Sequence, residues 1–211
     1  MRLDHVSYAC GHAGLEATVG RLSKQLATPI VDGGVHPRFG TCNAILPLAD
    51  DVYLEVVGVL EHPAAEKALF GQAVRRRVAE GGGWLGWVVA VDDVTSIAAR
   101  LGRHSDVGNR QRPDGRELRW RQVGVNGFVS DPQLPFFIEW ESEPDDHPAA
   151  NASGDVRIQR IEMAGDRDAL VAWLDEPGVD PLEGIALDWV DGPPGIVAVH
   201  FATPAGAVRV V

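Results

Sequence analysis

The sequence predicts an α+β fold built from repeated βαβββ modules, and three observations support this prediction. The order of strand, helix and run of strands recurs three times along the chain. Glycine-rich breaks interrupt the pattern at Gly33–Gly34 and at Gly81–Gly83. The alternating segments 2–9 and 157–164 have similar patterns. Identity between the modules is slight, so the prediction rests on element order and apolar spacing.

The first module spans residues 1–60. Its first strand, residues 2–9, alternates apolar and polar side chains. The next segment has the apolar spacing of one helical face, at Leu15, Val19, Leu22 and Leu26. Two further strands are predicted at 43–48 and 52–57. A connecting helix at about 64–80 then leads to the second module.

The second module, residues 84–142, repeats this order. Asp92 or Asp93 can cap its short helix, because a side-chain carboxylate accepts hydrogen bonds from the first free backbone N–H groups. Its strands are predicted at residues 84–91, 118–125 and 136–140. Together with the first module it forms a predicted paired unit of residues 1–142.

The third module, residues 155–211, follows an acidic, proline-containing linker at 143–154. A strand at 157–164 and a helix capped by Asp166 begin this module, and its remaining strands are predicted at 185–190, 196–202 and 207–211. Because two modules can pair, the third is left over. We expect it to cover the first two or to pair with its copy in a homodimer.

The composition excludes several classes of partner. The formal net charge of −11 argues against nucleic acid, whose binding depends on clustered Lys and Arg. The two cysteines, Cys10 and Cys42, form neither a disulfide framework nor a CxxC zinc pair. Residues 1–10 lack a signal-peptide pattern, and no apolar run approaches the roughly 20 residues of a membrane span. These features predict a cytoplasmic protein that binds a small molecule.

Candidate site residues in the first module follow from the two-residue alternation of strand side chains. Val6 and Leu54 suit the face of the sheet that a helix covers. His5 on the first strand, and Tyr53 and Glu55 on the last, then lie on the opposite face. A His or Glu alone at such a position is usually structural or solvent-facing, so the prediction depends on a second, matching pair.

The second module supplies that pair in this interpretation, with Trp87 on its first strand and Phe137 and Glu139 on its last. The spacings are 50 residues from His5 to Glu55 and 52 from Trp87 to Glu139. If the modules face each other, His5, Glu55 and Glu139 converge in one cavity, with Trp87 in the fourth place. One imidazole and two carboxylates could bind a divalent metal such as Fe, Mn, Zn or Ni.

A second group of candidates lies in segment 33–43. Its glycines permit a close backbone approach. His36, Arg38 and Asn43 supply donors that could orient an oxygen-bearing substrate. The alternative is a surface loop in which His36 and Arg38 are incidental.

Several short segments together resemble the glyoxalase-like domain family of the vicinal-oxygen-chelate superfamily. They are Leu3-Asp4-His5-Val6, Gly33-Gly34-Val35-His36-Pro37, Gly40-Thr41-Cys42-Asn43-Ala44, Tyr53-Leu54-Glu55 and Pro135-Phe136-Phe137-Ile138-Glu139-Trp140. The resemblance covers residues 1–142 well and the third module more loosely. It implies paired modules that form a cup-shaped mixed-sheet barrel around a divalent metal, with ligands from the first and last strands. It thus supports His5, Glu55 and Glu139, whereas Trp87 departs from the pattern because it cannot bind a metal.

Two functions remain open from the sequence. The first is a metal-dependent enzyme of lyase, isomerase or dioxygenase type that acts on a small oxygenated substrate, with Glu55 or Glu139 as the catalytic base. The second is a metal-free binding or sequestering protein, in which Tyr53, Trp87 and Phe137 line an apolar pocket and the glutamates select a cationic ligand.

Overall fold

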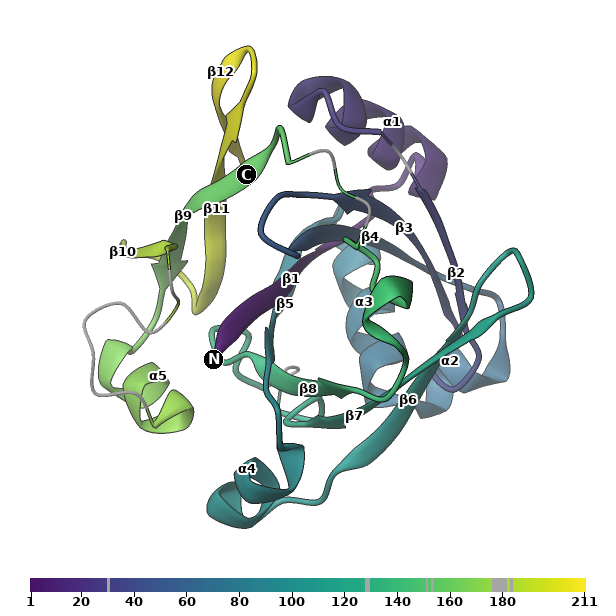
Figure 1. Cartoon of the computed structure of the whole chain (residues 1–211), viewed down its shortest axis with the longest axis vertical. Helices are drawn as coiled ribbons and strands as arrows, with labels where there is room; N and C mark the ends of the chain where they lie inside the picture. Colours follow the sequence, from purple (N-terminus) through teal and green to yellow (C-terminus); the bar gives the residue numbers. More distant parts are fainter. Residues whose placement is uncertain (30, 128–129, 151, 153, 176–181, 183) are drawn as a thin grey trace.

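In the computed structural model the chain forms two sheets, an eight-stranded closed barrel and a separate four-stranded sheet (Figure 1). This arrangement confirms the predicted α+β class and the repeated βαβββ modules. The structure describes residues 1–29, 31–127, 130–150, 152, 154–175, 182 and 184–211.

The barrel consists of two halves with the same element order. The first half contains β1 (Arg2–Ala9), α1 (Gly14–Leu26), β2 (Val31–His36), β3 (Thr41–Pro47) and β4 (Tyr53–Val59). The second half contains β5 (Gly83–Ala90), α4 (Val94–Leu101), β6 (Asp106–Gln111), β7 (Glu117–Val123) and β8 (Phe136–Trp140). The barrel closes in the order β1-β4-β3-β2-β6-β7-β8-β5, and in each half the first strand pairs in parallel with the last.

The helices begin where their capping residues predict. Asp93 accepts hydrogen bonds from the backbone N–H groups of Thr95 and Ser96 at the start of α4. The connection between the halves differs from the single predicted helix. It contains α2 (Pro63–Lys67) and α3 (Leu69–Ala79), because Ala68 between them has an extended backbone.

The faces of β1 agree with the alternation of its sequence. Val6 and Tyr8 belong to the outer hydrophobic core that includes Leu22 of α1. His5 and Ser7 lie on the inner face, where the Ser7 hydroxyl donates a hydrogen bond to Glu55. The predicted inward position of His5 and Glu55 is therefore confirmed.

The predicted faces of β5 and β8 are wrong by one residue. His5 pairs with Val88 of β5, and Val88 in turn pairs with Phe136 of β8. The two halves therefore correspond at an offset of 83 residues. Val88 in the second half is equivalent to His5, and Ile138 is equivalent to Glu55. The true spacing in the second half is the same 50 residues as in the first, but both positions are apolar. Every side chain near these positions is apolar except Glu139, so alternation could not reveal which face was which.

Three predicted site residues consequently lie on the outer face of the barrel. Trp87 pairs with Val6, is fully buried in the outer core, and donates its indole N–H to the carbonyl of Gln133 at 2.8 Å. Phe137 stacks on Trp173 with ring centroids 6.1 Å apart. Glu139 accepts a hydrogen bond from the backbone N–H of Val94, at the start of α4.

Two strands were not predicted, β2 and β6, and they meet at the seam of the barrel. Their sequences are rich in glycine and polar residues, which gives them the appearance of loops. Gly34 is required at this seam, because it has a φ of +109° and a Cβ there would lie 1.9 Å from the carbonyl oxygen of Gln111. His36 is the last residue of β2, so it lies in a strand and not in a surface loop.

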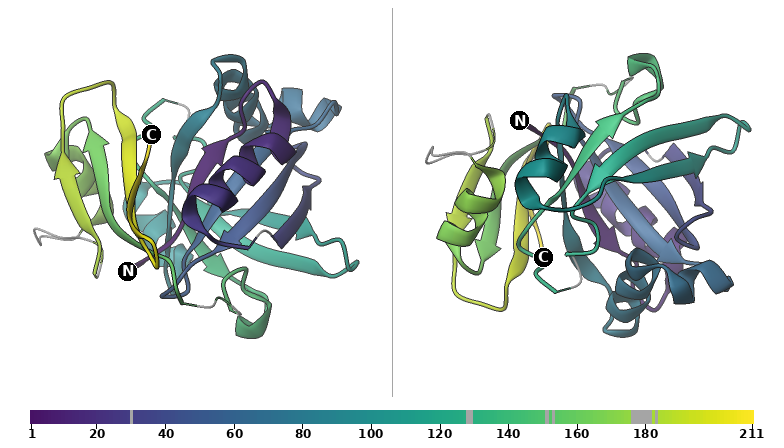
Figure 2. Two further views of the ribbon diagram at one scale, coloured as in Figure 1. Left: turned by 90° about the horizontal axis from the view of Figure 1, so that it is seen from above. Right: turned by 90° about the horizontal axis from the view of Figure 1, so that it is seen from below.

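The third module forms a sheet that packs on the outside of the barrel (Figure 2). It contains β9 (Arg157–Ala164), α5 (Arg167–Leu174), β10 (Ala186–Trp189), β11 (Gly195–Thr203) and β12 (Gly206–Val210). Its strand order, β10-β9-β11-β12, differs from that of the barrel halves, although its element order is βαβββ. Trp84 of β5 donates its indole N–H to the carbonyl of Val210. The third module thus covers the barrel, and the homodimer stays a prediction.

Within the described residues, no helix has both the length and the apolar character needed to cross a membrane.

Candidate functional site

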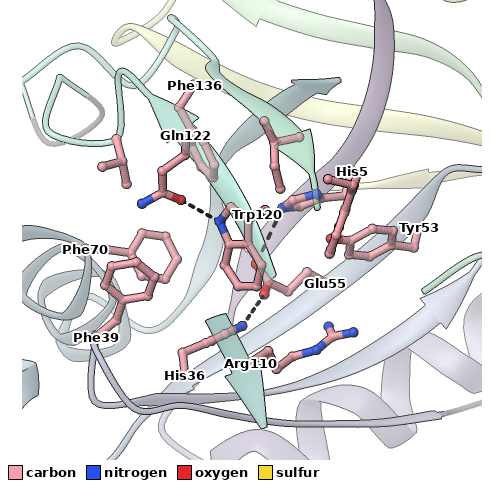
Figure 3. Close-up of a pocket in the computed structure, with 13 residues that line it drawn as sticks. His5, His36, Phe39, Tyr53, Glu55, Phe70, Arg110, Trp120, Gln122 and Phe136 are labelled. Carbon is pink, nitrogen blue, oxygen red and sulfur yellow. Dashed lines mark hydrogen bonds and ion pairs between the residues drawn. The ribbon is translucent and has the colours of Figure 1, made fainter. Parts of the chain in front are cut away.

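The inside of the barrel contains a small cavity of about 30 Å³, lined by side chains from both halves of the barrel. Its polar side comes from β1, β2, β4 and β6, which carry His5, His36, Glu55 and Arg110 (Figure 3). Its apolar side comes mainly from β7, β8 and α3, and includes Trp120, Phe136, Ile138 and Phe70. The imidazoles and the carboxylate of the cavity thus come from the first half of the barrel, and the second half adds Arg110, Gln122 and most of the apolar wall.

His5 is oriented by Asp4. The register of β1 against β5 shifts between Leu3 and His5, so Asp4 is an extra residue in a β-bulge and is fully buried. Its carboxylate lies 2.6 Å from Nδ1 of His5 and also accepts hydrogen bonds from the indole of Trp140 and from His147. Burial alone raises the pKa of Asp4, but the hydrogen bonds and positive charge of His147 and His5 outweigh it and hold that pKa well below its usual value.

The tautomer of His5 follows from this arrangement. An ionised carboxylate can only accept hydrogen bonds, so Nδ1 of His5 carries the proton and donates it to Asp4. In the neutral form of His5, Nε2 then presents a lone pair toward the cavity, 3.9 Å from Oε2 of Glu55. An imidazole held by a carboxylate in this way is suited to accept a proton.

Glu55 is buried but fully hydrogen-bonded. Its two oxygens accept hydrogen bonds from the Ser7 hydroxyl and the Asn43 amide, each at 2.7 Å. Burial raises the pKa of Glu55, but the neighbouring His5 and His36, together with these two hydrogen bonds, bring it below its usual value. Glu55 is therefore a fixed negative charge in the cavity wall.

His36 stays neutral at physiological pH. Its Nδ1 lies 3.0 Å from the Thr41 hydroxyl, and its Nε2 lies 3.8 Å from Oε1 of Glu55. Burial, together with the positive charge of Arg110 and His5, lowers the pKa of His36 to about 4 against the opposite effect of Glu55. The cavity consequently holds two imidazoles beside one carboxylate.

We expect His36 to make the stability of the protein depend on pH. Its folded pKa of about 4 is below the ordinary 6.5, so between these values the unfolded chain binds the extra proton. The free energy of unfolding should therefore be highest above pH 6.5 and fall by roughly 3 kcal/mol as the pH decreases to 4. Urea unfolding at several pH values should show this slope in the parent and a flatter one in His36→Gln. Equal slopes would contradict the neutral, buried state of His36.

The cavity brings together some of the predicted site residues and not others. His5, His36, Tyr53 and Glu55 line it, and Asn43 supports Glu55 from behind. The ring of Tyr53 stacks on that of His5 with centroids 4.4 Å apart. The residues outside the cavity are Arg38, which is exposed on the turn after β2, and the outer-face residues Trp87, Phe137 and Glu139.

Sequence reasoning missed four residues of the site. Strand alternation predicts that Asp4 lies on the opposite face from His5, and only the β-bulge brings it next to the His5 ring. Arg110 lies in β6, a strand whose sequence resembles that of a loop. Gln122 lies on a predicted strand with no signal of its own. His147 lies in the predicted linker, which folds back so that this imidazole reaches Asp4 at 3.2 Å. Of these four residues, only Asp4 could have been found from the sequence, because it is adjacent to His5.

The residues of the cavity do not fit the predicted metal centre. Glu139 is on the other face of the sheet, and the second-half positions that match His5 and Glu55 are Val88 and Ile138, which have no donor atoms. Across the described ranges, no cluster of three or more His, Cys, Asp or Glu side chains is arranged to hold a metal ion. The donors that do converge belong to the first half of the barrel.

Comparison with known proteins agrees with this architecture. A family model described as a glyoxalase-like domain matches residues 3–178. The solved structure of a hypothetical protein from Staphylococcus aureus is similar, with a TM-score of 0.65 and 15% identity over 92% of this chain and 88% of that chain. No curated protein matches the chain in sequence.

Two methylmalonyl-CoA epimerases are more distant in structure. The enzyme from Mycobacterium tuberculosis has a TM-score of 0.45 and 15% identity over 68% of this chain and 89% of its own. The enzyme from Streptomyces coelicolor, in complex with 2-nitronate-propionyl-CoA, has a TM-score of 0.46 and 18% identity over 67% of this chain and 99% of its own. Because the family model covers most of the chain, the protein belongs to the glyoxalase-like domain family.

Proposed function

We propose that the cavity is the active site of an enzyme of lyase or isomerase type, which transfers a proton on a small oxygenated substrate. The observation that carries this proposal is the pair of Asp4 and His5, with Nε2 of His5 directed into the cavity beside the ionised Glu55. A base of this kind is effective when it is oriented and screened from water.

In the proposed reaction, Nε2 of His5 removes a proton from a carbon next to a carbonyl group. The C–H bond breaks, its electron pair moves to the carbonyl oxygen, and His5 becomes an imidazolium that Asp4 and Glu55 stabilise electrostatically. The amide of Gln122 can donate to the enolate oxygen, because this residue lines the cavity and its Nε2 has no hydrogen-bond partner. Return of the proton to the substrate restores the neutral imidazole.

The test is exchange of carbon-bound protons in D₂O, followed by ¹H NMR. Phenylpyruvate and 4-phenyl-2-butanone are suitable probes, because one is an anionic and the other a neutral aromatic carbonyl compound. The parent should accelerate exchange of at least one of them above the protein-free rate.

A metal-free binding protein is the second candidate, and the apolar second half of the cavity favours it, with Trp120, Phe136 and Ile138 in its wall. This function predicts that the aromatic probes bind with no acceleration of exchange. Binding without exchange would therefore reject the proposed enzyme and support the second candidate.

Metal content gives an independent prediction. Since Val88 and Ile138 supply no ligands, we expect less than stoichiometric Fe, Mn, Ni or Zn after incubation and desalting of protein purified without a metal-binding tag. Plasma mass spectrometry measures this content. One metal per chain that is lost in His5→Ala and kept in Glu139→Gln would contradict the expectation. That result would place a metal on the first-half donors His5, His36 and Glu55.

A further inference from the structure

We infer that the cavity recognises a carboxylate attached to a flat apolar body, and that Arg110 is the anchor for that carboxylate. This inference rests on the cavity proposed above as the active site, but not on the reaction proposed there. It names the class of ligand, which the acid–base residues leave open.

Arg110 is a buried cation without a direct partner. It is 4% exposed, its side chain lines the cavity, and its Nε has no hydrogen-bond partner. Among the residues that the structure describes, no carboxylate forms an ion pair with it, although Glu55 and Asp4 attract it over a longer range. A guanidinium removed from water without a hydrogen-bonded anion is costly, so the free protein is incomplete at this position.

The two carboxylates that attract Arg110 already have other hydrogen-bond partners. Glu55 accepts hydrogen bonds from Ser7 and Asn43, and Asp4 from His5, Trp140 and His147. Figure 3 shows the Arg110 side chain on the same side of the cavity as Tyr53, away from the Trp120 ring. An anion that enters the cavity is therefore the partner that Arg110 lacks.

Gln122 supplies a second free donor, on the other side of the Trp120 ring from Arg110 (Figure 3). Its Oε1 accepts the indole N–H of Trp120 at 2.8 Å, which fixes the amide and leaves Nε2 directed elsewhere. Gln122 is 2% exposed, and Nε2 has no hydrogen-bond partner. A planar carboxylate matches the fork of a guanidinium, and a carbonyl oxygen elsewhere on the ligand would suit an amide N–H.

The shape of the apolar side determines the rest of the ligand. The Trp120 ring lies over Gly108 on the paired strand, where a Cβ would come within 2.1 Å of the indole nitrogen. The rings of His36 and Trp140 lie 6.1 and 5.5 Å from the Trp120 ring, and the rings of Phe39, Phe70 and Phe136 also line the cavity. Fixed aromatic walls of this kind favour a flat apolar group over a flexible or strongly hydrated one.

The experiment compares two probes of nearly equal shape, 3-phenylpropanoate and 3-phenylpropanamide, by isothermal titration calorimetry. The parent should bind the carboxylate at least ten-fold more tightly than the amide. Arg110→Met should remove this preference, and Arg110→Lys should retain part of it, because lysine keeps the charge without the fork. Arg116→Met is the matched control, since Arg116 is exposed and pairs with Asp114 and Asp146 outside the cavity.

Three results would overturn the inference. They are equal binding of the two probes by the parent, an unchanged preference in Arg110→Met, and tighter binding of phenyl phosphate than of the carboxylate. If Arg110→Met fails to fold, Gln122→Leu provides the second variant, and it should weaken phenylpyruvate more than 3-phenylpropanoate. Carboxylate preference without proton exchange would refute the proposed reaction and leave this inference standing.

Discussion

Replacing His5 with glutamine is expected to reduce the rate of proton exchange by about 10²–10⁴-fold, which is the usual contribution of a positioned general base. Glutamine preserves the size of the side chain and can still hydrogen-bond to Asp4, but it has no basic nitrogen. Binding of the aromatic probes should change much less than the rate, because the apolar wall and Arg110 remain in place. The exchange rate in D₂O and the dissociation constant of 3-phenylpropanoate measure the two effects separately.

Glu139→Gln is the informative companion of this variant. The sequence alone places Glu139 in the cavity, whereas in the structure it accepts the backbone N–H of Val94 on the outer face. Exchange by Glu139→Gln should therefore remain within a few-fold of the parent. A loss comparable to that of His5→Gln would show that the second half of the barrel has the register predicted from the sequence.

Asp4→Ala is expected to lower the free energy of unfolding by about 3–5 kcal/mol, which is typical when one partner of a buried charged network is removed. The carboxylate is fully buried and accepts hydrogen bonds from His5, Trp140 and His147. Alanine leaves these donors without a partner and creates a cavity. Urea unfolding at pH 7 measures the change.

Two comparisons make the Asp4 result specific. Asp93→Ala removes an exposed N-cap from α4 and should cost only about 1 kcal/mol. The pKa of Asp4 is depressed in the folded protein, so its contribution is present above the ordinary aspartate pKa and is lost as the pH falls toward the folded value. The stability difference between parent and Asp4→Ala should therefore shrink in acid. A difference below 1 kcal/mol at pH 7 would contradict the network described here.

The first half of the site could be predicted because its sequence is unambiguous. Between β1 and β4, one face carries His5, Ser7 and Glu55 and the other carries Val6 and Leu54, so polar and apolar residues alternate clearly. The second half offers no such contrast, because β5 and β8 are apolar on both faces. Glu139 is the single polar residue there, so the sequence suggested that it is equivalent to Glu55. The strand register does not support this equivalence.

The sequence by itself determined the α+β class, the repeated modules, the inward position of His5 and Glu55, and the membership of the glyoxalase-like family. The class, the modules and the inward residues follow from local periodicity, which each segment carries independently of the others, whereas the family follows from the resemblance of short motifs. Only the tertiary structure decided the face of Trp87 and Glu139, since a shift of one residue in strand pairing exchanges the two faces of a sheet. It also decided that Arg110 and His147 belong to the site, because closure of the barrel and the return of residues 143–150 bring them together across more than one hundred residues of chain from Asp4 and His5.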